Sequence, residues 1–284
     1  MIYFYQNQYL KTLELSCEML GLLRGYSAFE YIRTYDKKPF CLKGHLARFY
    51  FSIEKMNLCP SYTLEELEEI TLKLISHETQ DCGIKWYASG SKSVDGLRHD
   101  GRCEMFAFTI PMTPQPSSFY QSGIKAITVC EKRPLPEAKT TAYFTACQIL
   151  SQNKTVQEII YIDALGQLLE AATSNLFLVK DKKIYTSSLH VLHGITREVV
   201  LHLCKNRYEV IFTSVPLSSL SSFDEVFITA TNKEIMPVSK IDELEFKIGP
   251  VTRDLMQLFE DFKATFSNID LIPELYQGAI LLKS

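Results

Sequence analysis

Four residues spread along the chain have side chains that could take part in one reaction: Arg48, Lys139, Glu170 and Thr196. A lysine amine can attack a carbonyl carbon and form a Schiff base when burial or a nearby cation lowers its pKa. A carboxylate in a covered strand can keep a heterocyclic nitrogen protonated. An arginine and a threonine at a helix start both suit a phosphate group. This combination, in this order, favours an enzyme.

Lys139 lies in the segment PEAKTTAYF, where Pro134 and Pro136 lead the chain into an apolar helical pattern at 139–152. The pattern predicts Lys139 at the edge of that helix. A lysine in the first turn of a helix is commonly solvated, because an unpaired ammonium group is costly to bury. The residues alone favour a solvated lysine over a Schiff-base nucleophile.

Glu170 follows Leu168 and Leu169 in the segment DALGQLLEAATSNLFLV, after a turn at Gly166. Apolar strands flank that turn, so the segment should be covered, and a buried carboxylate needs a charged or hydrogen-bonding partner. The alternative interpretation is an edge-strand glutamate that faces water.

The two candidate phosphate-binding groups lie in helical patterns. The segment LHGITR precedes one of them, and a helix start offers backbone N–H groups and the Thr196 hydroxyl to an anion. By itself, a threonine in this place is most often an N-cap. Arg48 lies in the pattern 43–57, where a guanidinium could bind a phosphate with two parallel hydrogen bonds or form a surface salt bridge.

Hydrophobic periodicity and turn residues predict helices and strands that alternate without the regular βαβ rhythm of a Rossmann sheet. Prolines and small polar residues cluster at 111–118, which predicts a connector between domains. We expect an α+β fold with an N-terminal domain at 1–112, a connector at 113–122 and a C-terminal domain at 123–284. The expected helices are 43–57, 64–79, 139–152, 196–205 and 251–264, and the main expected strands are 26–35, 83–88, 103–110, 124–130, 157–162, 168–171, 175–179, 183–185, 208–212 and 225–229.

Composition argues against several classes of protein. A formal charge of −3 gives no broad basic surface, which disfavours nucleic acid as the main partner. No apolar run has the length of a membrane span, and the N-terminal residues lack the basic region of a signal peptide. The eight cysteines are scattered, with no C-x-x-C motif and no histidine at metal-ligand spacing. We therefore expect no metal site, and free thiols in the cytoplasm.

Five segments together resemble the class IV, or fold-type IV, pyridoxal-phosphate enzymes, which include branched-chain aminotransferase, D-amino-acid aminotransferase and aminodeoxychorismate lyase. The stretch RGYSAFEYIRTYDKKPFCLKGHLARF is similar to that family's opening strand pair and phosphate-arginine helix. RPLPEAKTTAYF resembles its Schiff-base segment, and DALGQLLEAATSNLFLV its pyridine-nitrogen segment. LHGITREVV resembles its phosphate turn, and TATNKEIMPV its last active-site turn.

The resemblance implies pyridoxal 5′-phosphate as cofactor, with Lys139 as the Schiff-base lysine that also moves a proton between substrate Cα and cofactor C4′. It implies that Glu170 pairs with the ring nitrogen and that Tyr143 lies near the ring's phenolic oxygen. The family has a small N-terminal α/β domain and a larger C-terminal β-rich domain, which enclose the cofactor in a cleft, and a homodimer completes the pocket. The phosphate ligands that it implies are Arg48, Ile195, Thr196 and Thr231.

The substrate residues that the resemblance implies are Phe29, Tyr31, Lys85 and Asn232. Tyr31 stands where branched-chain enzymes often have a glycine, and it would narrow or polarise the side-chain pocket. Lys85 lies near a position that is often arginine, and Ala142 replaces a frequent asparagine. These departures leave the cofactor residues intact but affect which amino acid is used.

The favoured activity is transamination between a hydrophobic or branched-chain L-amino acid and a 2-oxo acid such as 2-oxoglutarate. Release of pyruvate from aminodeoxychorismate in folate synthesis, or transamination of D-amino acids, would use the same cofactor residues, so these alternatives stay open. A non-catalytic homologue is disfavoured, because such a protein would most readily lose the lysine or the carboxylate, and Lys139 and Glu170 are both present.

Overall fold

The structure, a computed structural model, describes residues 1–266 and 271–281. The chain divides into two compact units, of which the first comprises Met1–Thr113, Glu137–Ala142 and the described residues from Phe266 on, and the second Pro114–Pro136 and Tyr143–Thr265. The segment 137–142, Phe266 and residues 271–281, which were expected in the C-terminal domain, thus belong to the first unit. The end of that expected domain, 282–284, lies outside the described residues.

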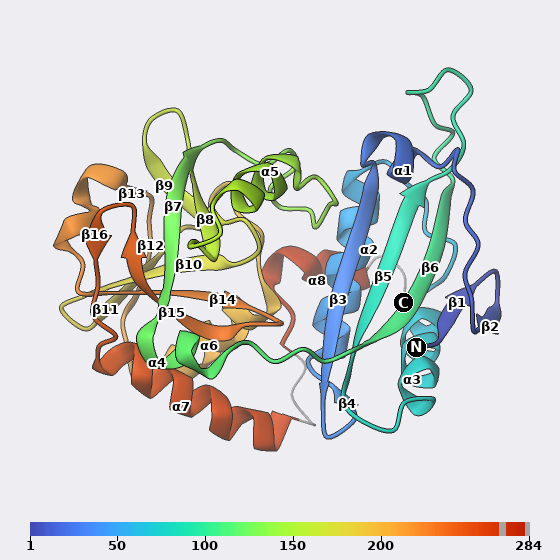
Figure 1. The fold of residues 1–284 in the computed structure, drawn as a ribbon. Coiled ribbons are helices and arrows are strands. Elements are labelled where there is room, and N and C mark those ends of the chain that lie inside the picture. Colours follow the sequence, from blue (N-terminus) through green and yellow to red (C-terminus); the bar gives the residue numbers. More distant parts are fainter. Residues whose placement is uncertain (267–270, 282–284) are drawn as a thin grey trace. The chain divides into compact units, whose positions relative to one another are not determined.

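Each unit is built around a sheet with helices, which confirms the expected α+β class (Figure 1). The first unit holds a six-stranded antiparallel sheet in the order β2-β1-β6-β5-β3-β4. Its strands are β1 (Tyr3–Tyr5), β2 (Gln8–Leu10), β3 (Ser27–Tyr35), β4 (Lys38–Pro39), β5 (Cys82–Gly90) and β6 (Cys103–Pro111). Its helices are α1 (Leu20–Arg24), α2 (Leu42–Lys55), α3 (Leu64–Ser76) and α8 (Glu274–Leu281).

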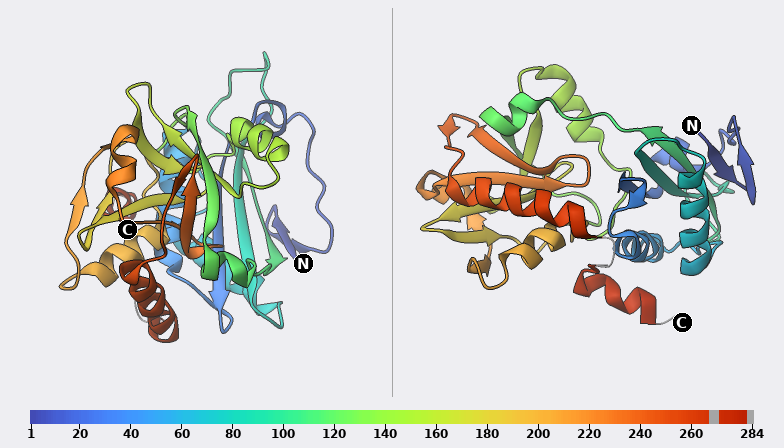
Figure 2. Two further views of the ribbon diagram at one scale, coloured as in Figure 1. Left: turned by 60° about the vertical axis from the view of Figure 1, so that its left-hand side comes forward. Right: turned by 90° about the horizontal axis from the view of Figure 1, so that it is seen from below.

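The two faces of β3 have different surroundings, because successive side chains of a strand point to opposite sides. Glu30 and Ile32 are buried on the face that α2 and α3 cover (Figure 2). Phe29 and Tyr31 are only partly buried and lie on the other face. The apolar stripes of α2 and α3 face the sheet, and α3 begins after its N-cap residue Thr63, which forms a capping box with the N3 glutamate. The strand therefore presents one set of groups to α2 and another to the open face.

The segment around Lys139 is not helical, so the expected helix at 139–152 is wrong in its first turns. α5 spans Phe144–Gln152, and residues 139–141 run in extended form beside β3. The Phe29 N–H donates to Lys139 O at 2.9 Å, and the Thr141 N–H donates to Ser27 O at 3.0 Å. The edge of β3 offers donors and acceptors that need partners, and the β-branched residues after Lys139 suit extended backbone.

The second unit holds a ten-stranded mixed sheet, whose order is β12-β11-β10-β14-β15-β7-β8-β9-β13 with β16 beside β15. α6 (Ile195–Cys204) and α7 (Pro250–Thr265) pack on it at β14 and β15 (Figure 2). α4 (Ser117–Ser122) and a 3₁₀ helix (Leu217–Ser222) complete the unit. The strands are β7 (Ile124–Cys130), β8 (Glu158–Ile162), β9 (Gln167–Ala171), β10 (Asn175–Lys180), β11 (Lys183–Thr186), β12 (Val210–Phe212), β13 (Val215–Pro216), β14 (Glu225–Ala230), β15 (Glu234–Ile241) and β16 (Leu244–Glu245).

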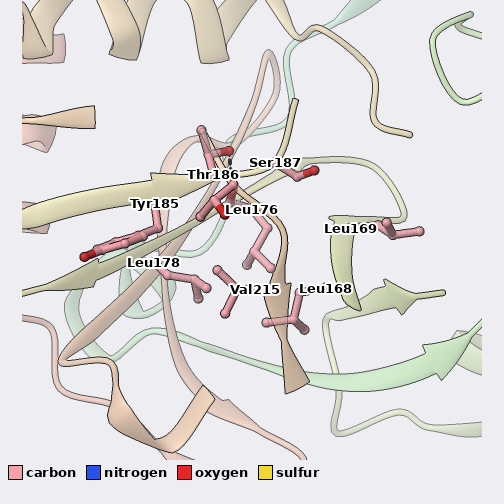
Figure 3. Close-up of a pocket in the computed structure, with 9 residues that line it drawn as sticks. Leu168, Leu169, Leu176, Leu178, Tyr185, Thr186, Ser187 and Val215 are labelled. Carbon is pink, nitrogen blue, oxygen red and sulfur yellow. Dashed lines mark hydrogen bonds between the residues drawn. The ribbon is translucent and has the colours of Figure 1, made fainter. Parts of the chain in front are cut away.

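A small cavity lies in the second unit among β9, β10, β11 and β13 (Figure 3). Its volume is about 10 Å³, and leucines such as Leu168 and Leu176 line it together with Val215. That volume is at most enough for one water molecule, so the cavity is too small for a substrate.

Two further classes of feature are absent from the part of the chain that the structure describes. No helix in it is long and apolar enough to cross a bilayer. No cluster of three or more histidine, cysteine, aspartate or glutamate side chains in the same residues could bind a metal ion.

Candidate active site

Lys139 lies in the first unit and is held by its main chain on two sides. Its carbonyl accepts from Phe29, and its N–H donates to Ser52 Oγ at 2.9 Å. Its ammonium nitrogen is 4.6 Å from the centre of the Phe29 ring, where the ring's face attracts a cation. The side chain is partly buried. A fixed main chain and a covered amine differ from the solvated first-turn lysine that the residues alone favour.

Ser52 connects the Lys139 segment to α2. Its Oγ accepts from the Lys139 N–H and donates to the Arg48 carbonyl at 2.8 Å, and Ser52 itself is fully buried. Sequence reasoning missed this residue. The available signal was its spacing, because positions four apart in a helix share one face, so Ser52 had to lie over Arg48.

Arg48 forms a buried ion pair with Glu30 of β3. Its Nε donates to Glu30 Oε2 at 2.8 Å and its Nη2 to Glu30 Oε1 at 2.6 Å. His45 Nδ1 is 3.0 Å from the same Oε1. Arg48 is 3% exposed and Glu30 is fully buried, so the surface salt bridge considered from the sequence is wrong. Glu30 holds the Arg48 guanidinium through Nε and Nη2 in a fixed orientation.

The charges of this group follow from burial and proximity. Burial raises the pKa of Glu30, but the Arg48 guanidinium, with His45, outweighs it and holds that pKa below its usual range. Burial lowers the pKa of His45, and the Arg48 and Lys139 charges lower it further, against the attraction of Glu30. Glu30 is therefore a carboxylate and His45 a neutral imidazole at neutral pH. His45 donates through Nδ1–H, which leaves Nε2 as an acceptor.

Buried polar atoms without a hydrogen-bond partner mark where a polar ligand would fit. Among the described residues of the first unit, His45 Nε2 and Thr140 Oγ1 are of this kind, and Thr140 adjoins Lys139 in the chain. In the second unit, Thr229 Oγ1 is another, close in sequence to Thr231. Such atoms are costly in a finished core, so a bound polar group near His45 and Thr140 would satisfy them.

Glu170 lies in β9 and is 4% exposed, so the water-facing edge glutamate considered from the sequence is wrong. Arg133 donates to its Oε1 from Nε at 2.8 Å and from Nη2 at 2.6 Å. Its Oε2 accepts from the Leu192 N–H at 2.9 Å and from Asn175 Nδ2 at 3.4 Å. This set of donors holds Glu170 as a carboxylate.

Arg133 is the partner that sequence reasoning missed. It is 5% exposed, and its Nη2 also donates to the Pro136 carbonyl at 2.7 Å. Burial lowers the pKa of Arg133, but the charge and hydrogen bond of Glu170, together with Tyr143 and Tyr161, outweigh burial and the pKa is raised. The signal in the sequence was the need of a buried carboxylate for a cation, although nothing local indicated which of the basic residues it would be.

The start of α6 is open for an anion. Its N-cap is Gly194, and no side chain caps the helix, so the expected alternative of Thr196 as N-cap is wrong. The N–H groups of Ile195 and Thr196 belong to the first turn, which lacks acceptors within the helix. A Cβ on Gly194 would lie 2.2 Å from Asn175 Oδ1, so the turn needs glycine there. These donors and the helix dipole suit a phosphate.

The turn after β14 carries Thr231 and Asn232, and Lys233 anchors it. Lys233 Nζ is 2.6 Å from Glu158 Oε2 and 2.6 Å from Thr173 Oγ1. Lys233 is 13% exposed and Glu158 is 1% exposed, so this ion pair is covered. The sequence did not single out Lys233, because the pairing joins strands far apart in the chain.

The remaining candidate residues are also divided between the two units. Tyr143 is the N-cap residue of α5 and is partly buried beside Tyr161 and Ile159. Tyr31 and Lys85 are register partners on β3 and β5. The first unit thus contains Phe29, Tyr31, Arg48, Lys85 and Lys139, and the second contains Tyr143, Glu170, Ile195, Thr196, Thr231 and Asn232.

Comparison with known proteins agrees with this combination of fold and side chains. The family model described as amino-transferase class IV matches residues 27–241. A D-alanine aminotransferase of Staphylococcus epidermidis is 31% identical over 267 residues, covering 88% of this chain and 92% of the relative. A Methanocaldococcus jannaschii protein provisionally named branched-chain-amino-acid aminotransferase is 32% identical, covering 86% and 89%.

Two solved structures have the same fold. The Escherichia coli branched-chain amino acid aminotransferase superimposes with a TM-score of 0.84 at 25% identity, covering 92% of this chain and 93% of that one. The T.th. branched-chain amino acid aminotransferase, determined with pyridoxamine 5′-phosphate, gives 0.82 at 26% identity, covering 98% and 96%. The fold is that of an α+β enzyme with one smaller and one larger sheet. The chain belongs to the class IV aminotransferases.

Proposed function

We propose that this chain transfers the amino group of a hydrophobic, branched-chain L-amino acid to 2-oxoglutarate, with pyridoxal 5′-phosphate as the cofactor of its family. The observation that carries the proposal is the placement of Lys139, whose main chain is fixed by Phe29 and Ser52 and whose amine lies over an aromatic ring. An amine whose main chain is fixed and whose position is set by a neighbouring ring is placed to attack an aldehyde carbon.

Each candidate residue has one part in this proposal. When bound, pyridoxal phosphate supplies an aldehyde that accepts the amino group and a ring that spreads negative charge. Lys139 holds the cofactor and moves the substrate proton between Cα and C4′. Glu170 keeps a proton on the ring nitrogen, and the donors around it maintain its own charge.

The anionic and polar parts of the ligands are assigned to the remaining residues. Tyr143 lies near the phenolic oxygen of the ring. The substrate side is assigned to Phe29, Tyr31 and Lys85, with backbone donors at Asn232 for the substrate carboxylate. The residues assigned to the cofactor phosphate are Arg48, Ile195, Thr196 and Thr231, a guanidinium together with an open helix start and a turn.

Removal of the amine tests the proposal. Lys139→Ala should abolish transamination. The residues that bind the cofactor phosphate should still retain some cofactor, which equilibrium dialysis with pyridoxal phosphate would detect. The matched control is Lys92→Ala, an exposed lysine of the same unit, which should leave turnover unchanged. Normal turnover in Lys139→Ala would refute the assignment.

Transamination of D-amino acids is the second candidate, supported by the 31% identity to a D-alanine aminotransferase. A panel of L- and D-amino donors with 2-oxoglutarate and pyruvate as acceptors separates the two. Release of pyruvate from aminodeoxychorismate is the lyase alternative. Stoichiometric conversion of the cofactor to its amine form by the donor alone, reversed by an oxo acid, supports transamination, and pyruvate release without that conversion supports the lyase.

We further propose that the chain acts as a homodimer in the cytoplasm. The first part rests on the resemblance to the family, and the second on the eight cysteines, all in the described part of the chain and all free. Light scattering coupled to gel filtration would test the dimer, and a mass of 32.5 kDa would contradict it.

A further inference from the structure

Gly83 of β5 lies directly against the side chain of Tyr31 in β3. The two strands pair with Arg33 opposite Gly83 and Tyr31 opposite Lys85, so Tyr31 is the diagonal neighbour of Gly83. A Cβ built on Gly83 would lie 2.5 Å from Tyr31 Cε2 and 2.8 Å from the Tyr31 hydroxyl oxygen. Both distances are too short for real contacts. The Tyr31 ring therefore occupies the space of a side chain at position 83.

Tyr31 and Phe29 lie on the same face of the first unit's sheet. The Lys139 amine is in contact with the ring of Phe29. Phe29 and Tyr31 are two residues apart in one strand, so they point to the same face and are separated by roughly 7 Å along it. A substrate whose Cα is within reach of the amine would extend its side chain over a distance of this order. Tyr31 is thus placed to contact that side chain.

The Tyr31 ring forms a wall whose position is set by Gly83 and Met112. Burial raises the pKa of its hydroxyl, so the side chain is neutral at physiological pH. The hydroxyl donates to the Met112 sulfur at 3.5 Å, which is a weak acceptor. The absence of a side chain at Gly83 leaves the space that the ring occupies. Ile110 Cγ1 of the neighbouring strand, 3.0 Å from the position of an added Cβ, borders the same space.

We propose that Gly83 is a specificity-determining position that acts through Tyr31, and that the pair limits the amino donor to aliphatic side chains of about valine or leucine size. The inference rests on the proposed function, because it assumes that a donor binds at Lys139. With Tyr31 packed on Gly83, the position of its ring is fixed, and the side chain of an aromatic donor such as phenylalanine collides with that ring. A residue larger than glycine at position 83 displaces the ring and changes that limit.

The selectivity test compares the kcat/KM of phenylalanine with that of valine in four proteins: the parent, Gly83→Ala, Tyr31→Ala and the double variant. Tyr31→Ala should raise the phenylalanine-to-valine ratio by about 10-fold or more, since one or two methylene-sized volumes in an apolar pocket discriminate by roughly 10- to 200-fold. Gly83→Ala should change the phenylalanine-to-valine ratio when Tyr31 is present. In the Tyr31→Ala background, it should have no further effect on that ratio.

A second readout does not depend on activity. In the apoprotein, Gly83→Ala should lower the melting temperature when Tyr31 is present, and much less in the Tyr31→Ala background, where only Ile110 is close. The matched control is Gly278→Ala, an exposed glycine of α8 with no heavy atom near the position of an added Cβ. This change should leave the phenylalanine-to-valine ratio unchanged and should not lower the melting temperature.

The possible outcomes separate this inference from the proposed function. If the parent transaminates no donor, the proposed function fails, while the melting temperatures still test the contact between Gly83 and Tyr31. If the parent is active and Tyr31→Ala leaves the phenylalanine-to-valine ratio unchanged, the inference is overturned. It is also overturned if Gly83→Ala lowers the melting temperature equally in both backgrounds, because position 83 then acts through its own backbone.

Discussion

Arg133 donates from both Nε and Nη2 to a single oxygen of Glu170, at 2.8 and 2.6 Å, and both side chains are 5% exposed or less. The other Glu170 oxygen is left to accept from backbone and amide donors. Arg133 therefore determines both the charge of Glu170 and the direction in which its second oxygen points. The pair is the main electrostatic feature of the second unit's candidate site.

Removal of Arg133 should destabilise the protein strongly. Arg133→Met leaves the Glu170 charge buried without its cation, and breaking a buried pair in this way costs about 3–5 kcal/mol of unfolding free energy. Urea denaturation of the apoprotein measures the loss.

Arg207 provides the matched control for that measurement. It binds Asp254 with the same two donors, at 2.8 and 2.7 Å, but it is 51% exposed. Arg207→Met should therefore cost less than about 1 kcal/mol. Equal losses of unfolding free energy in the two variants would show that burial does not make the Arg133–Glu170 pair more important for stability than the exposed pair.

Glu170→Gln should keep the fold but slow removal of the substrate proton. A neutral amide cannot hold a proton on the ring nitrogen, so a loss of about 10²- to 10⁴-fold in the rate is expected. Its NH₂ group would also face N–H donors from either Arg133 or Leu192. That mismatch should cost about 1–3 kcal/mol of stability.

Glu225→Gln is the control that separates the two effects. Glu225 is also a buried carboxylate, which accepts from the N–H groups of Val251 and Thr252 at 3.1 and 2.7 Å. Its variant should lose stability for the same reason and keep the single-turnover rate with a saturating donor. A Glu170→Gln protein with the parent's rate would remove Glu170 from its proposed role.

Glu30 should contribute a pH-dependent part of the stability. Burial raises the pKa of its carboxyl, but the Arg48 charge, with His45, outweighs burial and places the pKa in the folded protein below the usual 4.5. The unfolded chain then binds more protons in acid, so this contribution is complete above about pH 4.5 and is lost as the pH falls. Glu30→Gln should be much less stable than the parent at pH 7, and the difference should shrink in acid. Urea midpoints between pH 7 and pH 4 measure it, and a constant difference would contradict the prediction.

Ser52→Ala should loosen the Lys139 segment. It deprives the Lys139 N–H of its acceptor inside the first unit, which should cost about 1–3 kcal/mol, and it should weaken cofactor binding. Ser76 is the control, since its hydroxyl donates to the Lys73 carbonyl at 2.7 Å on an exposed face of α3. Ser76→Ala should change stability by less than about 0.5 kcal/mol. Cofactor binding in Ser52→Ala that matches the parent would rule out this positioning role.

The residues that the sequence could predict are those with a recognisable local setting. Lys139, Glu170 and the turn before α6 each lie in a segment whose pattern resembles a known family, and α2 and α3 follow from their apolar stripes. The α+β class follows from the loose alternation of elements. All of these depend on neighbours within one short stretch of chain.

The residues that escaped prediction act through partners distant in the sequence. Arg133 and Glu170 are 37 positions apart, and Ser52 and Lys139 are 87 apart. The helix expected from 139 was wrong at its start for the same reason, because the edge of β3 supplies partners that a local pattern does not contain. Hydrogen bonding to a strand edge outweighs helix propensity when the edge would otherwise lack partners.

Reduction of the pyridoxal-phosphate-loaded protein with borohydride, followed by proteolysis and mass spectrometry, tests the central assignment most directly. The account predicts a pyridoxyl phosphate group attached to Lys139, and none attached in the Lys139→Ala variant. An adduct on any other side chain of the active parent protein, or no adduct at all, would contradict it.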